Sequence, residues 1–92
     1  MQNFDWDPVK SLKLKAERGV SFEDIATAFE ENRILDRAYN PNQKKYPGQK
    51  ILMVRIGDYM YAVPFVSREE IVFLKTIYPS RTATRKYLKK GE

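Results

Sequence analysis

IVFLKTIYPSRTATRKYLKK, residues 71–90, is a β-branched and aromatic run that a Pro-Ser pair separates from a basic segment. The run predicts a strand from Ile71 to Tyr78, and because both of its faces are mostly apolar, a central one. Pro79 ends this strand, and Ser80 is a suitable N-cap for a helix spanning about Arg81 to Lys90. The rest of the expected fold is arranged around this strand and helix.

The basic segment is unusual in its charge. Between Lys75 and Lys90 the chain has six Lys or Arg residues and no carboxylate. The whole chain has a net charge of +5, to which residues 1–33, 34–67 and 68–92 contribute −2, +3 and +4. A basic excess concentrated in the second and third parts indicates an anionic partner.

Composition excludes several kinds of site. The 92 residues contain no cysteine and no histidine, so disulfides, thiolate metal sites and a Ser-His triad are impossible. We expect no cofactor and no metal. The length suits a single domain over residues 1–92, and neither a signal peptide nor an apolar membrane span is visible, which predicts a cytoplasmic protein with no membrane partner.

Two helices are predicted before the sheet. Asp7 and Pro8 suit the start of the first helix, and Gly19 suits its left-handed end. Ser21 starts the second, with Asp24 completing a variant of the capping box. The expected core faces are Val9, Leu12 and Ala16 in the first helix, and Phe22, Ile25, Ala26 and Phe29 in the second.

The middle of the chain predicts a small sheet. Residues 34–38 suit a short edge strand, and residues 51–56 and 59–66 are β-rich runs joined by the hairpin signal Gly57-Asp58. Pro64 cannot donate to a ladder, so its strand should be at an edge there or carry a bulge. The expected class is therefore α+β, with two N-terminal helices, an antiparallel sheet of three to four strands, and a basic C-terminal helix.

The segment YNPNQKKYPGQK, residues 39–50, predicts an exposed loop because it is rich in Pro, Asn and Gly. Tyr39, Lys44, Lys45 and Tyr46 in this segment suit contacts to nucleic acid by charge and stacking, and Lys50 is a further candidate for RNA binding. A solvated loop whose tyrosines pack locally explains the same residues equally well.

Lys75 stands out because it lies in the middle of an otherwise apolar strand. Lys75 can face an anion-binding groove, and Arg81 can then lie at the entrance of the same groove. Alternatively, Lys75 can extend its ammonium group past the sheet to water. Arg81, Arg85 and Lys89 repeat every four residues and form one cationic stripe, which is either a binding surface or a solvated helix face.

Without histidine, a metal-free ribonuclease remains chemically possible, because RNA supplies its own nucleophile, the 2′-hydroxyl. Arginine can stabilise the phosphorane oxygens, and a Lys or Tyr whose pKa neighbouring cations lower could transfer the proton. Tyr87 and Tyr46 are the candidates for that proton transfer. The candidate catalytic residues are Lys75, Arg81, Arg85 and Tyr87, and the candidate RNA-binding residues are Lys44, Lys45, Tyr46, Lys50, Lys86, Lys89 and Lys90.

Three segments, FDWDPVK, RGVSFEDIATAF and KTIYPSRTATRKYLKK, resemble the BrnT toxins of bacterial type II toxin–antitoxin systems, whose segments read approximately F-x-W-D-x-x-K, HGVSFEEA and ISARKATRRER. By this resemblance Arg81 matches the arginine of S-A-R, and Arg85 and Lys86 match the basic pair that follows. Lys75 falls where the last strand of the family carries a basic residue. The chain departs at Arg18, where the family has histidine, and at YPS, where it has SA.

The resemblance implies a RelE-like ribonuclease fold, cleavage of RNA that arrests translation, and neutralisation by a cognate antitoxin in a hetero-oligomer. A non-catalytic module that binds RNA or an acidic protein through the same basic face is the alternative, since a shared fold does not establish a working site.

Overall fold

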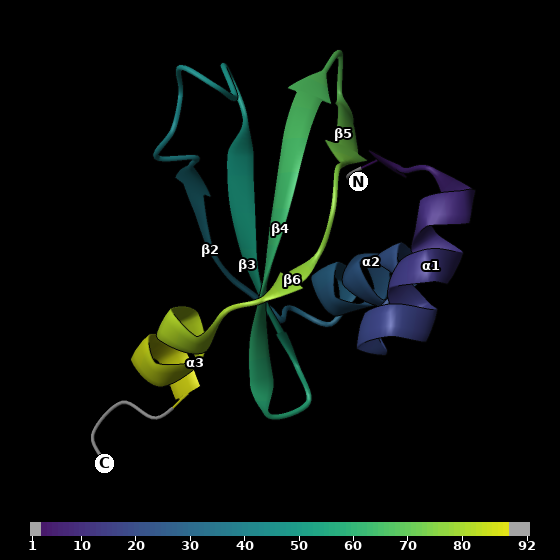
Figure 1. Ribbon diagram of the computed structural model, residues 1–92, viewed down its shortest axis with the longest axis vertical. Coiled ribbons are helices and arrows are strands. Elements are labelled where there is room, and N and C mark those ends of the chain that lie inside the picture. Colours follow the sequence, from purple (N-terminus) through teal and green to yellow (C-terminus); the bar gives the residue numbers. More distant parts are fainter. Residues whose placement is uncertain (1–2, 89–92) are drawn as a thin grey trace.

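The computed structural model describes residues 3–88, and the chain folds as an α+β structure (Figure 1). None of the helices within these residues is long and apolar enough to cross a membrane. The elements are β1 Asn3–Asp5, α1 Pro8–Arg18, α2 Phe22–Glu30, β2 Ile34–Tyr39, β3 Lys50–Ile56, β4 Tyr59–Arg68, β5 Ile71–Leu74, β6 Tyr78–Pro79 and α3 Arg81–Leu88.

The sheet is larger than the sequence indicated, and it is mixed. Its six strands run in the order β1-β5-β4-β3-β2, with β6 also paired to β4. The pairs among β2 to β5 are antiparallel, as expected, but β1 pairs with β5 in parallel, Phe4 opposite Val72. β1 escapes prediction because its alternation, Asn-Phe-Asp, extends over only three residues, which is too short to indicate a strand.

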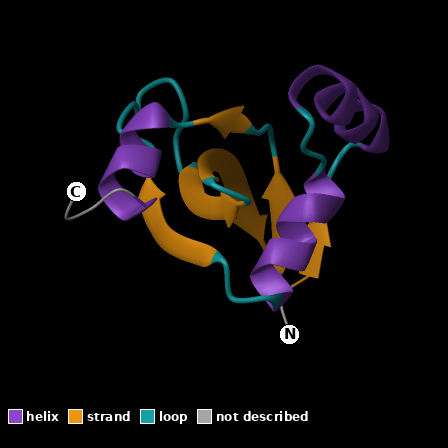
Figure 2. Ribbon diagram, turned by 90° about the horizontal axis from the view of Figure 1, so that it is seen from below, coloured by secondary structure: helices purple, strands orange, loops and turns teal. Residues whose placement is uncertain are grey.

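The helices cover opposite faces of the sheet. Figures 1 and 2 place α1 and α2 to one side of it and α3 to the other. We call the first side the core face, because its strand residues pack with α1 and α2 into one buried cluster, and the second the α3 face. The central cluster members are Leu14, Phe22 and Ile25 from the helices and Leu52, Val54, Val63, Phe65, Val72 and Leu74 from the strands.

The local signals at element ends are confirmed. The Asp7 carboxylate accepts from the amides of Val9 and Lys10, and Gly19 ends α1 with a φ of 76°. Ser21 and Asp24 form the expected reciprocal capping box at the start of α2. Gly57, with a φ of 62°, begins the two-residue connection between β3 and β4.

The predicted core face of α1 is wrong. Val9 and Leu12 are 68% and 74% exposed, whereas the buried residues of α1 are Ser11 and Leu14. The hydroxyl of Ser11 accepts from the amide of Phe22 at 3.0 Å and donates to the Glu23 carboxylate at 2.6 Å. A polar residue that joins α1 to the start of α2 therefore occupies the centre of the buried face, which the apolar pattern could not indicate.

The predicted strand Ile71 to Tyr78 is interrupted. β5 ends at Leu74, where the Lys75 amide donates to the Pro64 carbonyl at 2.8 Å. Pro64 has no N–H to return that bond, so the ladder opens and resumes only at β6. The break changes the side-chain alternation: Ile77, expected on the same face as Lys75, is instead buried in the core cluster.

The C-terminal helix, expected to reach Lys90, is described only from Arg81 to Leu88. Lys89 and Lys90 lie outside the described residues.

Candidate nucleic-acid interface

Lys75 follows β5 and projects from the α3 face of the sheet. Phe73 pairs with Val66 on this face, and alternation along the strand places Lys75 on the same side. Its Nζ lies 5.1 Å from the centroid of the Phe73 ring, and the side chain is exposed. The ammonium group is therefore held over an aromatic surface where an anion can reach it.

Two adjoining hollows share Lys75, and we call them together the Lys75 cleft. One hollow has a volume of about 350 Å³ and the other about 450 Å³. Neither is lined by a carboxylate among the residues that the structure describes. The lining residues are Lys10, Asn40, Tyr46, Gln49, Pro64, Thr76 and Tyr78 in the first, Pro47, Gly48, Val66, Ser67, Arg68 and Phe73 in the second, and Lys75 in both.

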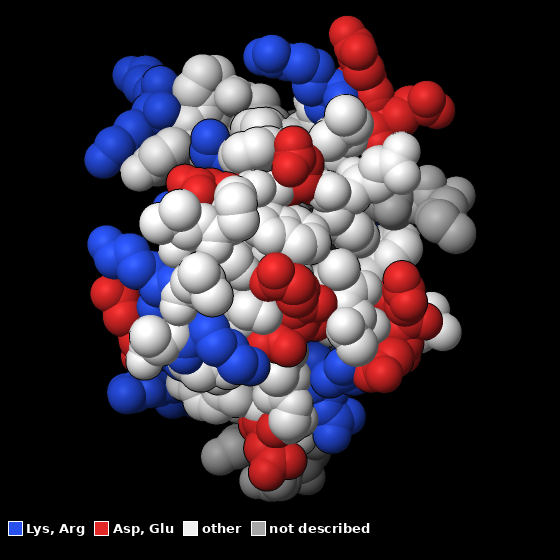
Figure 3. All heavy atoms as spheres, turned by 90° about the vertical axis from the view of Figure 1, so that its right-hand side faces the viewer, with Lys and Arg blue, Asp and Glu red and all other residues white. Residues whose placement is uncertain are grey.

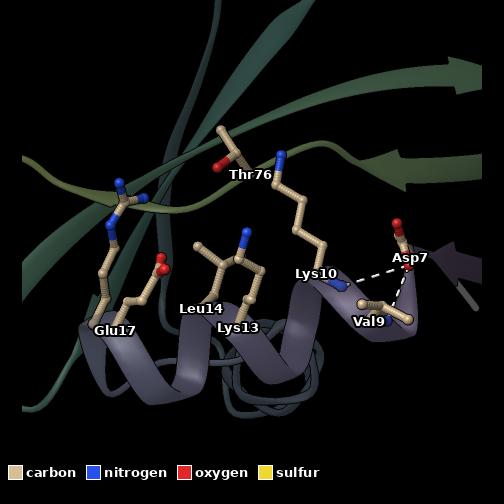
Figure 4. A pocket seen from close by; sticks show the side chains of 8 residues that line it. Asp7, Val9, Lys10, Lys13, Leu14, Glu17 and Thr76 are labelled. Carbon is tan, nitrogen blue, oxygen red and sulfur yellow. Dashed lines mark hydrogen bonds between the residues drawn. The ribbon is translucent and has the colours of Figure 1, made fainter.

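A third hollow, of about 390 Å³, continues the cleft beneath α1 and shares Lys10 and Thr76 with it. Figure 4 shows the Lys10 side chain rising from α1 toward Thr76. Asp7 and Glu17 join Lys10 and Lys13 in lining this hollow. Its charges are therefore mixed, whereas the described residues that line the Lys75 cleft include no carboxylate.

The β2–β3 loop holds Tyr46 at the cleft through bonds within the loop. The backbone N–H of Asn40 donates to the backbone carbonyl of Gln49 at 2.9 Å, and the Gln43 Nε2 donates to the backbone carbonyl of Asn40 at 2.7 Å. These bonds close the loop at its base and make it a folded unit rather than a free connection. Tyr46, predicted as a stacking residue, is thereby brought into the same cleft as Lys75.

The other lysines predicted to bind RNA in this segment lie in two places, on the loop itself and on the core face of the sheet. Lys44 and Lys45 are exposed on the loop, and the Lys45 Nζ lies 5.4 Å from the Tyr46 ring centroid. Lys50 pairs with Phe65, a core residue, and therefore projects from the core face, where its Nζ lies 5.0 Å from the Tyr39 ring. Lys50 is thus on the opposite face of the sheet from Lys75.

Helix α3 is fixed to the α3 face by hydroxyl groups. Ser80 caps the helix by accepting from the Ala83 amide at 3.1 Å. The hydroxyl of the buried Thr84 accepts from the Met60 amide at 2.8 Å and donates to the Ser80 carbonyl at 2.8 Å. Arg81, Arg85 and Lys86 remain exposed on this anchored helix. None of the hollows described above is lined by Arg81 or Arg85, so the structure does not bring them into one cavity with Lys75.

Tyr87, the predicted proton-transfer residue, is engaged by a carboxylate. Its hydroxyl donates to the Asp36 side chain on β2. This bond raises the pKa of Tyr87 above its ordinary value of 10.0 and lowers the pKa of Asp36 below 3.8. A raised pKa leaves less of Tyr87 in the phenolate form that could accept a proton near neutral pH, which is the opposite of the shift that the sequence-based hypothesis requires.

Several lining residues were missed from the sequence. Lys10 was not singled out from the sequence, and Asn40 and Gln49 were expected only to belong to a loop. Their one signal was the density of amide side chains in residues 40–49, which is equally typical of turns. Arg68 and Tyr78 carried no signal, because each enters the cleft through strand pairing.

The side of the molecule that carries α1 and α2 differs in charge from the cleft. Figure 3 shows basic and acidic groups both scattered over the uncharged surface on that side. Across residues 3–88 no group of three or more His, Cys, Asp or Glu side chains is placed to hold a metal ion.

Comparisons of this chain with protein-family models, with curated proteins and with solved structures find no match.

Proposed function

We propose that this protein is a ribonuclease that binds RNA in the Lys75 cleft and serves as the toxin of a type II toxin–antitoxin system. The observation that carries the proposal is the composition of the cleft: Lys10, Lys75 and Arg68 share its lining with aromatic residues, and none of the described residues that line it is a carboxylate. Cations bind phosphates and aromatic faces stack on bases, and this combination is typical of surfaces that bind single-stranded RNA.

The fold is compatible with the proposal. A compact sheet with helices is what the BrnT resemblance implies, and the RelE-like assignment remains part of the proposal. The segments that carry the resemblance contribute β1, α2, and the connection from Lys75 into α3.

The proposed reaction needs no group from outside the RNA and the protein. The ribose 2′-oxygen attacks the adjacent phosphorus as the bond from phosphorus to the 5′-oxygen breaks, leaving a 2′,3′-cyclic phosphate and a 5′-hydroxyl. The proton lost by the 2′-hydroxyl goes to a base, and the leaving oxygen takes up another. Lys75 is assigned to stabilising the charge on the phosphorane oxygens, and Arg81 and Arg85, which line none of the hollows described above, to binding neighbouring phosphates of the same RNA.

Among the tyrosines, Tyr46 suits proton transfer better than Tyr87. Tyr46 lines the cleft with Lys75, whereas the Tyr87 hydroxyl is occupied by Asp36 and its pKa is raised. We therefore assign the proton-transfer role to Tyr46 and regard Tyr87 as a residue that ties α3 to β2.

The test measures RNA integrity and protein synthesis after induction of the wild type, Lys75→Ala and Arg81→Ala in bacterial cells. The proposal expects RNA fragments ending in cyclic phosphates with the wild type and at least about a hundredfold less cleavage with Lys75→Ala, the size of effect that loss of one transition-state donor has in other enzymes. Lys15→Ala is the matched control, because Lys15 lies on α1 in an ion pair with Asp24 and lines none of the hollows. Intact RNA with growing cells after wild-type induction would refute the ribonuclease.

A non-catalytic RNA-binding module is the second candidate, and the engaged state of Tyr87 favours it. Binding of fluorescent single-stranded RNA separates the two candidates. If the wild type binds RNA but leaves it intact, this second function is correct. If Arg81→Ala keeps RNA binding while losing cleavage, the binding-only function is excluded.

An antitoxin partner in a cytoplasmic hetero-oligomer belongs to the same proposal. The exposed Val9 and Leu12 on α1 support a protein partner, because two large apolar side chains on one helix face gain from being covered. Lys10 and Lys13 beside them suit a partner with acidic side chains.

A further inference from the structure

Gln49 is a buried polar residue in the wall of the Lys75 cleft. It lies just before β3, is only 9% exposed, and lines the same hollow as Lys75 and Tyr46. A buried carboxamide has one acceptor and two donors to satisfy, so its unused groups show what the cleft is built to bind.

The orientation of the Gln49 carboxamide follows from the backbone amide of Asn42, because the side chain of Asn40 bonds to both. The Asn42 amide lies 2.9 Å from the side chain of Asn40, and because a backbone N–H can only donate, the Asn40 atom that it meets is Oδ1. Asn40 therefore turns Nδ2 toward Gln49, at 2.7 Å. An NH₂ group can only donate, so the Gln49 atom that receives this bond is Oε1.

The other end of the carboxamide is left free. Within residues 3–88 no hydrogen bond uses the Gln49 Nε2. In the same residues Arg33 Nε is the one fully buried side-chain nitrogen or oxygen without a partner, so Nε2 remains accessible to solvent. Gln49 thus lines the cleft with a carboxamide whose acceptor is already in use and whose Nε2 group has no partner among residues 3–88.

We propose that Gln49 reads one base of the bound RNA by donating from Nε2 to a keto oxygen, so that the cleft prefers uracil or guanine at this position. Uracil has the acceptor O4 where cytosine has an amino group, and guanine has O6 where adenine has an amino group. The amino group of cytosine or adenine is itself a donor, so it cannot accept a hydrogen bond from the Gln49 Nε2. The base stacks on Tyr46 or Tyr78, which line the same hollow. This inference rests on the proposed function, because it requires RNA in the cleft.

The test compares two pyrimidine ligands of the same size. Fluorescent oligouridylate and oligocytidylate of about eight nucleotides are titrated with the full chain at neutral pH. For the wild type we expect about tenfold tighter binding of oligouridylate, from one gained hydrogen bond and one avoided pair of facing donors.

Gln49→Glu keeps the acceptor that Asn40 needs and replaces the free donors with an acceptor. We expect this variant to reverse the preference, because a carboxylate accepts from the cytosine amino group. Thr27→Glu is the control, since it adds the same charge at an exposed position of α2, on the other side of the sheet. It should leave the ratio of the two dissociation constants as in the wild type.

Asn40→Ala tests the orienting step. Without Asn40 the Gln49 carboxamide can rotate and offer either end, so the ratio of dissociation constants should fall to about one while binding persists. If Asn40 had only a structural role, its replacement would weaken the binding of both oligonucleotides equally and leave the ratio of their dissociation constants unchanged. Circular dichroism of each variant establishes that it is folded.

Two results would overturn the inference while leaving the proposed function intact. One is equal binding of the two oligonucleotides by the wild type, and the other is an unchanged ratio in Gln49→Glu. If the wild type binds neither oligonucleotide, the proposed function fails as well.

Discussion

Replacing Thr84 with valine should loosen the attachment of α3 to the sheet. Valine has nearly the shape of threonine, so the change removes the hydroxyl and little else. In the wild type this hydroxyl accepts from the Met60 amide, taking the place of a strand partner beyond the end of β6. The Ser80 carbonyl keeps a second donor, the Thr84 amide, at 3.0 Å. The substitution therefore leaves one buried donor, the Met60 N–H, without a partner.

An unpaired buried donor costs about 1–3 kcal/mol, so we expect the free energy of unfolding to fall by about 2 kcal/mol. For a domain of this size that corresponds to a decrease in Tm of about 10 °C. Thermal and urea unfolding, followed by circular dichroism, measure both quantities. Thr82→Val is the matched control, because Thr82 is exposed on the same helix and should change stability by less than about 0.5 kcal/mol. If Thr84→Val is no more destabilising than Thr82→Val, the hydroxyl does not hold α3 as argued.

Three further outcomes follow from the contacts of α1 and α3. Leu14→Ala should cost about 2–5 kcal/mol and Leu12→Ala less than about 0.5 kcal/mol, because Leu14 is 4% exposed and Leu12 74%; equal costs in urea unfolding would restore the face predicted from the sequence. Gly19→Ala should cost about 1–2 kcal/mol through its positive φ alone, since no neighbouring atom in the described part of the chain lies within 4 Å of an added Cβ, and thermal unfolding measures this. Tyr87→Phe should raise the pKa of Asp36 toward its ordinary value. In the wild type the lowered pKa gives stability that is present above about pH 4 and is lost as the pH falls through the folded-state pKa, and an NMR titration of Asp36 that shows no change would contradict this.

The distribution of charge has a consequence for the candidate site. Along the sequence, Lys75, Arg81 and Arg85 belong to one segment without carboxylates, as if they formed one surface. In the structure Lys75 lines the cleft with Lys10 from α1 and Arg68 from β4, while Arg81 and Arg85 are exposed on α3. RNA that contacts both groups must therefore extend from the cleft toward α3, with different phosphates at Lys75 and at the two arginines.

Predictions that rested on local chemistry were confirmed. The N-cap at Asp7, the left-handed Gly19, the capping box at Ser21 and the hairpin at Gly57 each depend on the backbone of a few neighbouring residues. Side chains within that span determine which backbone groups are satisfied, so the sequence suffices to place the ends of α1 and α2 and the tight turn between β3 and β4.

Predictions that depended on contacts between residues far apart in the chain were not confirmed. Pro64 could be recognised as unable to donate, but only strand pairing places it opposite Lys75, where it ends β5 and moves Ile77 into the core. Ser11 could not be recognised as a buried residue, because its partners are the amide of Phe22 and the carboxylate of Glu23 on another helix.

The sequence by itself determined the α+β class, the helix ends, the hairpin, and a basic excess around Lys75, because these follow from local backbone chemistry and from composition. The tertiary structure alone decided which residues share a cavity with Lys75. It brings Lys10 from α1 and Tyr46 and Gln49 from the β2–β3 loop into one hollow with Lys75. The physical reason is that a cleft is formed by side chains far apart in the chain, and their approach depends on strand register and helix packing, which no local pattern encodes.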